Sequence, residues 1–247
     1  KGDFTHYGDQ TLLLLETIAS RPGFDLDHFS QAWQAFFQSY DGYVDKATQT
    51  TLENFSAGKA ASESGSDSTD LGGAARIAPL VYWYGNNETD LVTAARSQTI
   101  MTHHHPGVVE AAVFFSKVMV KILEGAAPTA AIDQVTENAF ANSTVSDWVR
   151  AGQNSVNSDT LETIADFGQM CTTSAAFPSV IHLITKYENN LKDALVENVM
   201  AGGDSAARGM ITGMVLGAHL GMDAIPKIWL SELSARDRIE KVMERSL

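Results

Sequence analysis

Helical periodicity runs through almost the whole chain, and this feature most limits the possible folds. Between breakers, apolar residues recur at the spacing of one helix face, and no stretch shows alternating β-branched residues. The pattern therefore predicts an all-α protein. A single compact orthogonal bundle of roughly a dozen helices, formed by residues 1–247 as one domain, is the packing that we expect.

Breaker residues divide the chain into predicted helices. The first is expected to begin around Asp9 and the second around Asp27, where an aromatic stripe favours core packing, and Asp45 is expected to cap a third. The remaining predicted helices cover 74–84, 88–99, 106–124, 127–140, 145–151, 158–167, 177–187, 191–200, 205–220 and 231–245. Residues 56–70 are small or polar, and this composition predicts a long mobile loop.

Composition and charge exclude several classes of protein. Apolar residues make up 44% and charged residues 19% of the chain, which is ordinary globular usage, and the apolar runs are too short or interrupted to cross a bilayer. The net charge of −13, with no local basic patch, argues against nucleic-acid and anionic-membrane partners. Cys171 is the single cysteine and is interpreted as a buried structural thiol. We therefore expect a cytoplasmic, soluble protein.

Two glycine-aspartate turns are the strongest candidates for a functional site. Gly8 and Asp9 lie in the segment YGDQT, and Gly203 and Asp204 lie in the segment GGDSAARGM. Each aspartate precedes a helical pattern, so it is interpreted either as a helix cap or as a binding carboxylate. A neighbouring glycine lets a backbone approach a phosphate or ribose closely. The two motifs together predict one pocket built from both ends of the chain.

Two further motifs suggest ligand contacts. Gly72 and Gly73 open a predicted helix with Arg76 on its first turn, an arrangement in which an anion would meet free N–H groups and a guanidinium. The segment THHHP places His103 where it would line a pocket, although surface or capping histidines are an equal alternative. No second His or Cys cluster completes a zinc site.

In their order and spacing these motifs resemble the ADP-ribosylglycohydrolase family. The resemblance rests on YGDQT, GGAARIAPL, THHHP, GGDSAARGMITGMVLGA and IPKIW, and it covers most of the chain. The YGDQ variant is most similar to the branch that contains the jellyfish J1 crystallins, which are lens proteins. Members usually begin with a helix that this sequence lacks ahead of Lys1. The resemblance therefore implies either a partial form or a second chain that completes the core.

Family members usually hold two Mg²⁺ ions between an early Thr-Asp-Asp-Thr and a late Asp-x-Asp-Thr, and the ions anchor the ribose of ADP-ribose. The corresponding residues here are Gly8, Asp9, Gln10 and Thr11, then Asp204, Ser205, Ala206 and Ala207. Only two carboxylates remain. Mg²⁺ wants six oxygen ligands, so we expect no metal or one weakly bound Mg²⁺ at Asp9 and Asp204. Arg208, one turn after Asp204, is expected to reach that carboxylate and replace the metal charge.

The resemblance implies binding of ADP-ribose, a related nucleotide sugar or an ADP-ribosylated substrate, with hydrolysis of the glycosidic bond if the site is active. Asp204 and Asp9 are the catalytic candidates, and Asp204 is the preferred general base. The expected ligand-binding residues are Gly8, Gln10, Thr11, Gly72, Gly73, Arg76, His103, Gly203, Ser205 and Arg208. The alternative is a non-catalytic, crystallin-like or regulatory protein that keeps the helical fold for stability and solubility.

Overall fold

The computed structural model describes residues 1–21 and 23–244 and is built from helices. They are α1 (His6–Ser20), α2 (Leu26–Gln38), α3 (Lys46–Ser56), η1 (Ala61–Glu63), α4 (Gly72–Ala75), α5 (Ala78–Tyr84), α6 (Glu88–Thr102), α7 (Pro106–Leu123), α8 (Pro128–Ala139), α9 (Thr144–Asn154), α10 (Thr160–Phe167), α11 (Thr173–Lys186), α12 (Leu191–Met200), α13 (Ser205–Leu220), η2 (Met222–Ala224), α14 (Lys227–Ser231) and α15 (Arg236–Glu244). Within the described residues, β-structure is limited to two isolated bridges, Ser66–His103 and Asp70–Thr172. The predicted all-α class is confirmed.

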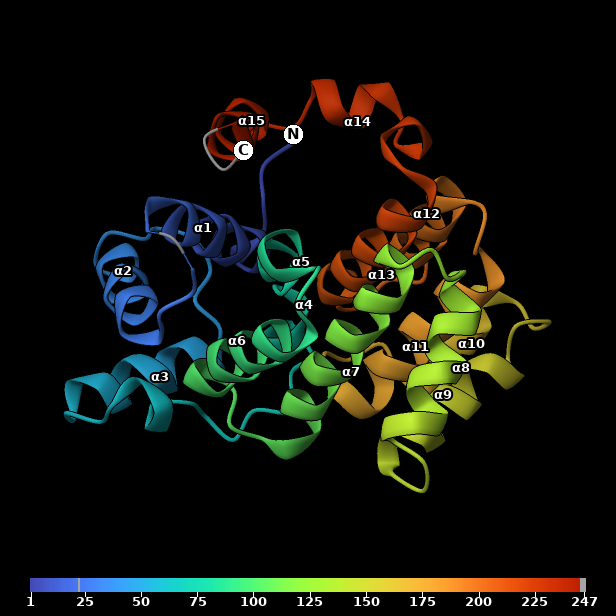
Figure 1. Ribbon diagram of the computed structural model, residues 1–247, viewed down its shortest axis with the longest axis horizontal. Coiled ribbons are helices and arrows are strands. Elements are labelled where there is room, and N and C mark those ends of the chain that lie inside the picture. The colour runs from blue at the N-terminus through green and yellow to red at the C-terminus, as the bar shows by residue number, and fades with distance from the viewer. Residues whose placement is uncertain (22, 245–247) are drawn as a thin grey trace.

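Helix α7 occupies the centre of the bundle, with α6, α13 and α8 packed around it (Figure 1). It is apolar on nearly all sides, and its buried residues include Phe114 and Phe115. A helix of this kind must be surrounded by other elements. The N-terminal residues lie beside the C-terminal helices, since Lys1 pairs with Glu232 at 2.7 Å and α1 contacts α15 (Figure 1). None of the helices in the described ranges is long and apolar enough to cross a membrane.

Helices α9 and α11 pack at very close range through Gly152. A Cβ atom at this position would lie 2.5 Å from the Pro178 carbonyl oxygen and 2.6 Å from the Ile181 Cβ. We therefore expect Gly152→Ala to destabilise the fold by about 1–3 kcal/mol, which is typical of overpacking. The matched control is Gly217→Ala on α13, where the nearest atom would lie at an ordinary 3.9 Å. This change is expected to stabilise by about 0.5–1 kcal/mol. If both variants changed the free energy of unfolding in urea equally, the close contact at Gly152 would be contradicted.

Several helix limits differ from the predicted ones. Helix α1 begins at His6 rather than near Asp9, and α11 begins at Thr173 rather than Phe177. The predicted helix 74–84 is two helices, α4 and α5, separated at Arg76 and Ile77. The predicted helix 231–245 begins later, as α15 from Arg236, because Ser231 ends the separate helix α14, and its last residue lies outside the described residues. Asp45 does cap α3, since its carboxylate accepts from the Thr48 N–H at 2.7 Å.

Residues 57–60 are exposed, whereas residues 61–71 pack against α6. The Ser64 hydroxyl donates to the Met101 carbonyl at 2.8 Å, and the Ser66 N–H donates to the Thr102 carbonyl at 3.0 Å. Gly65 permits this approach, because a Cβ there would lie 2.0 Å from the Ile100 carbonyl oxygen. The small residues that suggested a mobile loop thus serve close backbone packing. One result is that Asp70 is held beside α11.

Candidate functional site

A cluster of Tyr7, Asp70, Cys171 and Asp204 forms where three loops meet the start of α1. The Tyr7 hydroxyl lies 2.7 Å from the Asp70 carboxylate and 3.1 Å from the Asp204 carboxylate. Asp70, Cys171 and Asp204 each offer one potential ligand atom, and these atoms all lie within 4.8 Å of one another. The cluster therefore brings two carboxylates, a phenol and a thiol from distant parts of the chain to one place.

Backbone hydrogen bonds hold the three loops together. The Leu71 N–H donates to the Cys171 carbonyl at 2.9 Å, and the Asp204 N–H donates to the Gln169 carbonyl at 2.9 Å. Each loop leads directly into a helix, namely α4, α11 or α13. Gly72 lies against the Tyr7 ring, where a Cβ atom would come within 2.1 Å. Glycine at this position is therefore needed for Tyr7 to reach both carboxylates.

Burial and negative charge dominate the electrostatics of the cluster. Burial raises the pKa of the Asp70 carboxyl, although its bonds from the Gly72 N–H and from Tyr7 oppose the shift. Burial, with Asp70 and Asp204 nearby, raises the pKa of the Cys171 thiol to about 12. The same three causes raise the pKa of the Tyr7 phenol well above its usual value. Cys171 is thus a neutral thiol near pH 7 and a poor nucleophile.

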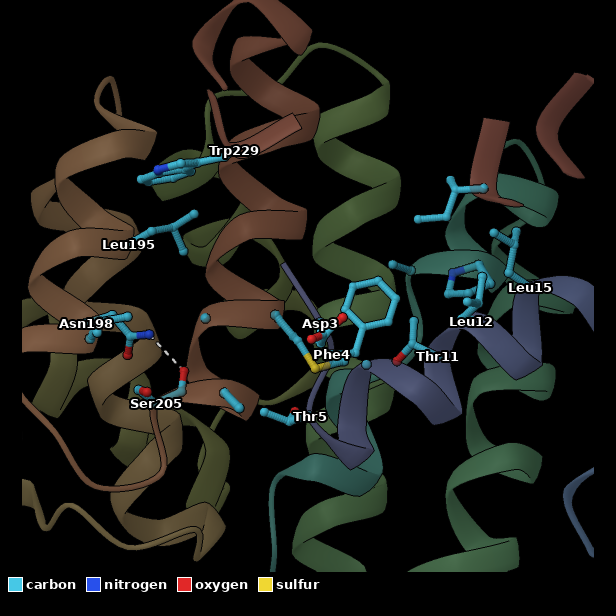
Figure 2. Close-up of a pocket in the computed structure, with 18 of the residues that line it drawn as sticks. Asp3, Phe4, Thr5, Thr11, Leu12, Leu15, Leu195, Asn198, Ser205 and Trp229 are labelled. Carbon is cyan, nitrogen blue, oxygen red and sulfur yellow. Dashed lines mark hydrogen bonds between the residues drawn. The ribbon is translucent and has the colours of Figure 1, made fainter. Parts of the chain in front are cut away.

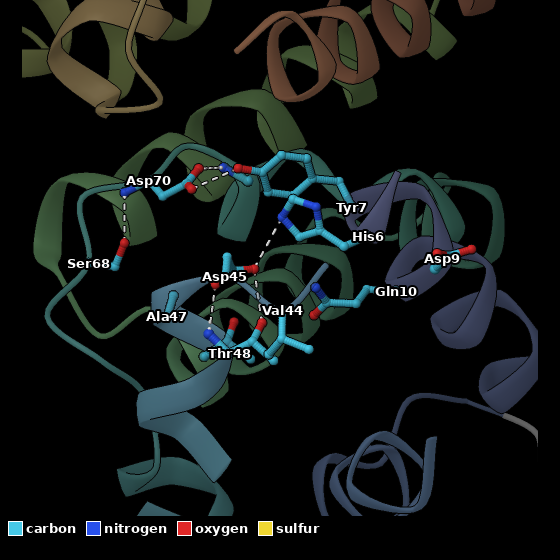
Figure 3. Close-up of polar contacts among 12 residues, drawn as sticks. His6, Tyr7, Asp9, Gln10, Val44, Asp45, Ala47, Thr48, Ser68 and Asp70 are labelled. Carbon is cyan, nitrogen blue, oxygen red and sulfur yellow. Dashed lines mark hydrogen bonds and ion pairs between the residues drawn. The ribbon is translucent and has the colours of Figure 1, made fainter. Parts of the chain in front are cut away.

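Asp9 lies outside this cluster. Residues two apart on a helix are about 200° apart around its axis, so Asp9 and Tyr7 point in nearly opposite directions. The Asp9 carboxylate instead accepts from the Tyr40 hydroxyl at 2.7 Å, and Figure 3 shows it directed away from Asp70. The early and late motifs do meet, as predicted. The residue of the early motif that reaches Asp204 is Tyr7, however, and not the predicted Asp9.

A large groove lies beside the cluster. Its volume is about 860 Å³, and Gly8, Thr11 and Ser205 from the predicted set are among its lining residues. The walls come from α1, α5, α12 and α13, with Trp229 of α14 at one end (Figure 2). The lining is mostly apolar and, among the described residues, includes no Lys or Arg. Such a lining favours contact with an uncharged part of a ligand.

Arg76 and the Gly72–Gly73 turn are not arranged as an anion site. The Arg76 guanidinium is buried and donates to Gln10 at 2.8 Å, to Gln98 at 2.6 Å and to Thr102. The Gly72 N–H is bonded to the Asp70 carboxylate at 2.7 Å. These groups already have partners inside the protein, so the expected free donors are absent. Gln10 is likewise a buried residue, which also accepts from Trp33.

His103 is buried behind the Gly73 turn and does not line the groove. Its ring lies so close to Gly73 that a Cβ there would meet it at 2.5 Å, and its Nδ1 lies 2.9 Å from the Thr102 hydroxyl. Burial, followed by the charge of Arg76, lowers the pKa of His103 to about 3. His103 is therefore a neutral residue of the interior.

Acid is expected to destabilise the fold through His182. Burial, followed by the charge of Lys186, lowers its pKa from 6.5 to about 4. Between these values the unfolded chain binds more protons, so the stabilisation is complete above about pH 6.5 and is lost as the pH falls towards 4. The loss between about pH 7 and about pH 4.5 should be smaller in His182→Gln than in wild type or in the exposed control His104→Gln. An equal loss in all three proteins would contradict this assignment.

Arg208 does not bind Asp204 directly. The side chain is fully buried, and its guanidinium donates to the Asn198 side chain at 2.9 Å and to the Gly202 carbonyl at 2.6 Å. The predicted ion pair with Asp204 is not formed, because the guanidinium is directed at Asn198 of α12 and at Gly202. Gly203 forms part of the same turn, with φ of 64°.

Sequence reasoning missed Tyr7, Asp70 and Cys171 as members of one cluster. Asp70 lies two residues before the Gly72–Gly73 pair, and Asp204 directly follows the Gly202–Gly203 pair, so this similarity was the available signal. Tyr7 is the first residue of a motif in which the aspartate drew attention. Cys171 carries no local signal, since only the fold places it between two carboxylates.

Comparisons with known proteins establish the family. A family model described as ADP-ribosylglycohydrolase matches residues 1–247. Crystallin J1A of Tripedalia cystophora is 24% identical over 259 residues, covering 99% of this chain and 79% of that protein. ADP-ribosyl-[dinitrogen reductase] glycohydrolase of Rhodospirillum rubrum is 24% identical over 177 residues, covering 71% of this chain and 54% of that protein.

A solved structure titled "ADP-ribosylglycohydrolase-related protein complex" has the same fold. It superimposes with a TM-score of 0.77 at 23% identity and covers 99% of this chain and 81% of that chain. The chain belongs to the ADP-ribosylglycohydrolase family. The resemblance that the motifs indicated, including its similarity to J1 crystallins, is confirmed.

Proposed function

We propose that this protein binds ADP-ribose, or a related nucleotide sugar, with its ribose at Asp70 and Asp204, and that it hydrolyses the glycosidic bond. The observation that carries the proposal is the meeting of these two carboxylates around the Tyr7 hydroxyl. Carboxylates are strong hydrogen-bond acceptors for the hydroxyl groups of a sugar. The family provides the class of ligand.

Within this proposal the two carboxylates have different roles. Asp70 is buried and held by Tyr7 and by the Gly72 N–H, so it serves to orient the ribose. Asp204 is only half-buried and makes no capping bond to α13, so it is free to accept a proton from water. The water oxygen bonds to the anomeric carbon as the glycosidic bond breaks, the proton goes to Asp204, and the leaving group is protonated by solvent.

In this proposal the adjoining groove contacts an uncharged part of the substrate. Ser205 and Ala206, which follow Asp204, and Gly8, which follows Tyr7, all line it. A ribose at the two carboxylates would therefore have its neighbouring groups at the groove entrance. Because the described lining contains no Lys or Arg, we expect the diphosphate to face solvent rather than the groove.

The residues of the cluster do not fit a pair of Mg²⁺ ions. Mg²⁺ demands near-octahedral oxygen coordination, whereas the cluster offers two carboxylates and a neutral thiol, and Asp9 points elsewhere. We propose at most one weakly bound ion and assign no chemical step to it. Calorimetric titration with MgCl₂ is expected to give no stoichiometric binding at micromolar concentrations. Stoichiometric micromolar binding would contradict this part of the proposal.

Thermal unfolding with and without ADP-ribose tests the proposed function. A ligand at about 100 times its Kd should stabilise the folded state by about 2.7 kcal/mol. AMP, which lacks the second ribose, is the control and should stabilise less. Release of ADP-ribose from ADP-ribosylated arginine or serine peptides then tests hydrolysis. No shift with ADP-ribose and only background release would overturn the proposal.

The similarity to Crystallin J1A favours one alternative, a structural protein without catalytic activity. Under this alternative the protein keeps the compact helical fold for its stability and solubility. The carboxylate cluster is then a remnant of an ancestral site. The same thermal unfolding experiment separates the two functions, because a structural protein gains no stability from ADP-ribose.

A further inference from the structure

The turn that carries Asp204 requires external support. Gly202 and Gly203 both adopt left-handed conformations, with φ of 71° and 64°. The Asp204 side chain makes no hydrogen bond to the first turn of α13, so local capping does not fix its direction. Its position near Tyr7 must therefore depend on neighbouring elements.

Arg208 and Asn198 bind the backbone on both sides of Asp204. Arg208 donates to the Gly202 carbonyl at 2.6 Å and to the Asn198 side-chain oxygen at 2.9 Å. The Asn198 side-chain amide in turn donates to the Ser205 carbonyl at 2.8 Å. The two side chains thus hydrogen-bond to the backbone before and after Asp204, and we call them the Arg208–Asn198 clamp.

Burial indicates that the clamp has a specific purpose. Arg208 is fully buried and Asn198 is 1% exposed, and Arg208 forms no ion pair with any carboxylate in the part of the chain that the structure describes. Burying a guanidinium without a paired carboxylate is costly. The planar fork of arginine holds two acceptors in fixed directions, whereas a lysine ammonium does not. Fixed geometry at Gly202 and Asn198 is thus what arginine supplies here.

We propose that Arg208 and Asn198 are positioning residues that hold the Asp204 carboxylate beside Tyr7 and opposite Asp70. The effect on ligand binding rests on the proposed function, whereas the effect on the position of Asp204 does not. A different role, in which the clamp only stabilises the junction of α12 and α13, predicts loss of stability without a specific loss at Asp204.

Asn198→Ala and Arg208→Lys test the clamp, with Asn87→Ala as the control. Asn87 caps the first turn of α6, where its side-chain oxygen accepts from the Asp90 N–H at 3.2 Å, and it belongs to none of the loops of the cluster. We expect Asn198→Ala and Arg208→Lys to weaken ADP-ribose binding by about tenfold, the size of one lost charged or buried hydrogen bond. Asn87→Ala should lose thermal stability, as is usual when a cap is removed, but keep its affinity. Equal affinities in Asn87→Ala and Asn198→Ala, with wild type binding ADP-ribose, would overturn the proposal.

A crystal structure of Asn198→Ala separates failure of the clamp from failure of the proposed function. If wild type does not bind ADP-ribose, the proposed function fails, but the clamp still predicts that Asp204 moves out of hydrogen-bond distance of Tyr7 in this variant. If Asp204 stayed 3.1 Å from the Tyr7 hydroxyl, as in wild type, the proposed role of the clamp would be overturned. Asn198→Ala alone provides both measurements if Arg208→Lys does not fold.

Discussion

Asp204→Asn is expected to weaken ADP-ribose binding by about 10- to 100-fold and to bring hydrolysis to background. A hydrogen bond to a charged group contributes about 1.5–3 kcal/mol, which corresponds to that range of affinity. Asparagine keeps the size of the side chain and one acceptor oxygen but removes the charge and the capacity to accept a proton. Calorimetry with ADP-ribose and a peptide-release assay measure the two effects.

Asp9→Asn is the control for this prediction. Both aspartates were catalytic candidates in the sequence, but the Asp9 carboxylate is bonded to Tyr40 and lies outside the cluster. We therefore expect less than a threefold change in affinity for Asp9→Asn, which is about the scale of an ordinary surface substitution. A large loss in Asp9→Asn with little change in Asp204→Asn would show that the early motif, rather than the Asp70–Asp204 cluster, binds the ligand.

Arg76→Met is expected to lower the free energy of unfolding by about 2–4 kcal/mol. The substitution removes the donor to Gln98 and one of the donors to Gln10, which lie in the interior with Arg76. Losing bonds from a charged donor, and leaving a buried acceptor without one, each cost about 1–3 kcal/mol. Burial lowers the pKa of the Arg76 guanidinium to about 10, so it remains charged at neutral pH and needs these acceptors. Urea unfolding of the variant measures the loss.

Arg96→Met provides the comparison, because Arg96 is exposed on α6 and its replacement should change stability by no more than about 0.5 kcal/mol. The prediction for Arg76→Met would be wrong if this variant changed the free energy of unfolding as little as Arg96→Met does and selectively lost affinity for ADP-ribose. That result would support the anion-binding role that the Gly72–Gly73 turn first suggested.

The helical architecture was predictable because its signals are local. Periodic apolar residues identify helices such as α7, and Asp45 caps α3 where its sequence position indicates. Helix starts were less predictable. Residues 6–8 ahead of Asp9 include Gly8, which suggested a turn, but they continue α1 by more than half a turn. An aspartate that resembles a cap therefore lies within the first turn of the helix.

The composition of the site was not predictable from local signals. Asp70 reaches Tyr7 only because residues 61–71 pack along α6, and that packing depends on the close contact at Gly65. The direction of Arg208 depends on Asn198, which lies on a different helix. The sequence correctly indicated that Asp204 and the early motif meet. Which side chain of the early motif meets Asp204 is decided by the rotation of α1.

Calorimetric titration of ADP-ribose into the protein in the presence of EDTA tests whether the Asp70–Asp204 cluster binds ribose without metal. We expect one binding site per chain without divalent metal, because Asp70, Asp204 and Tyr7 contact the ribose themselves. We also expect Asp204→Asn to weaken this binding and Asp9→Asn to leave it unchanged. Binding that disappears in EDTA and returns only with two Mg²⁺ per chain, or no binding under any condition, would contradict the proposed role of the cluster.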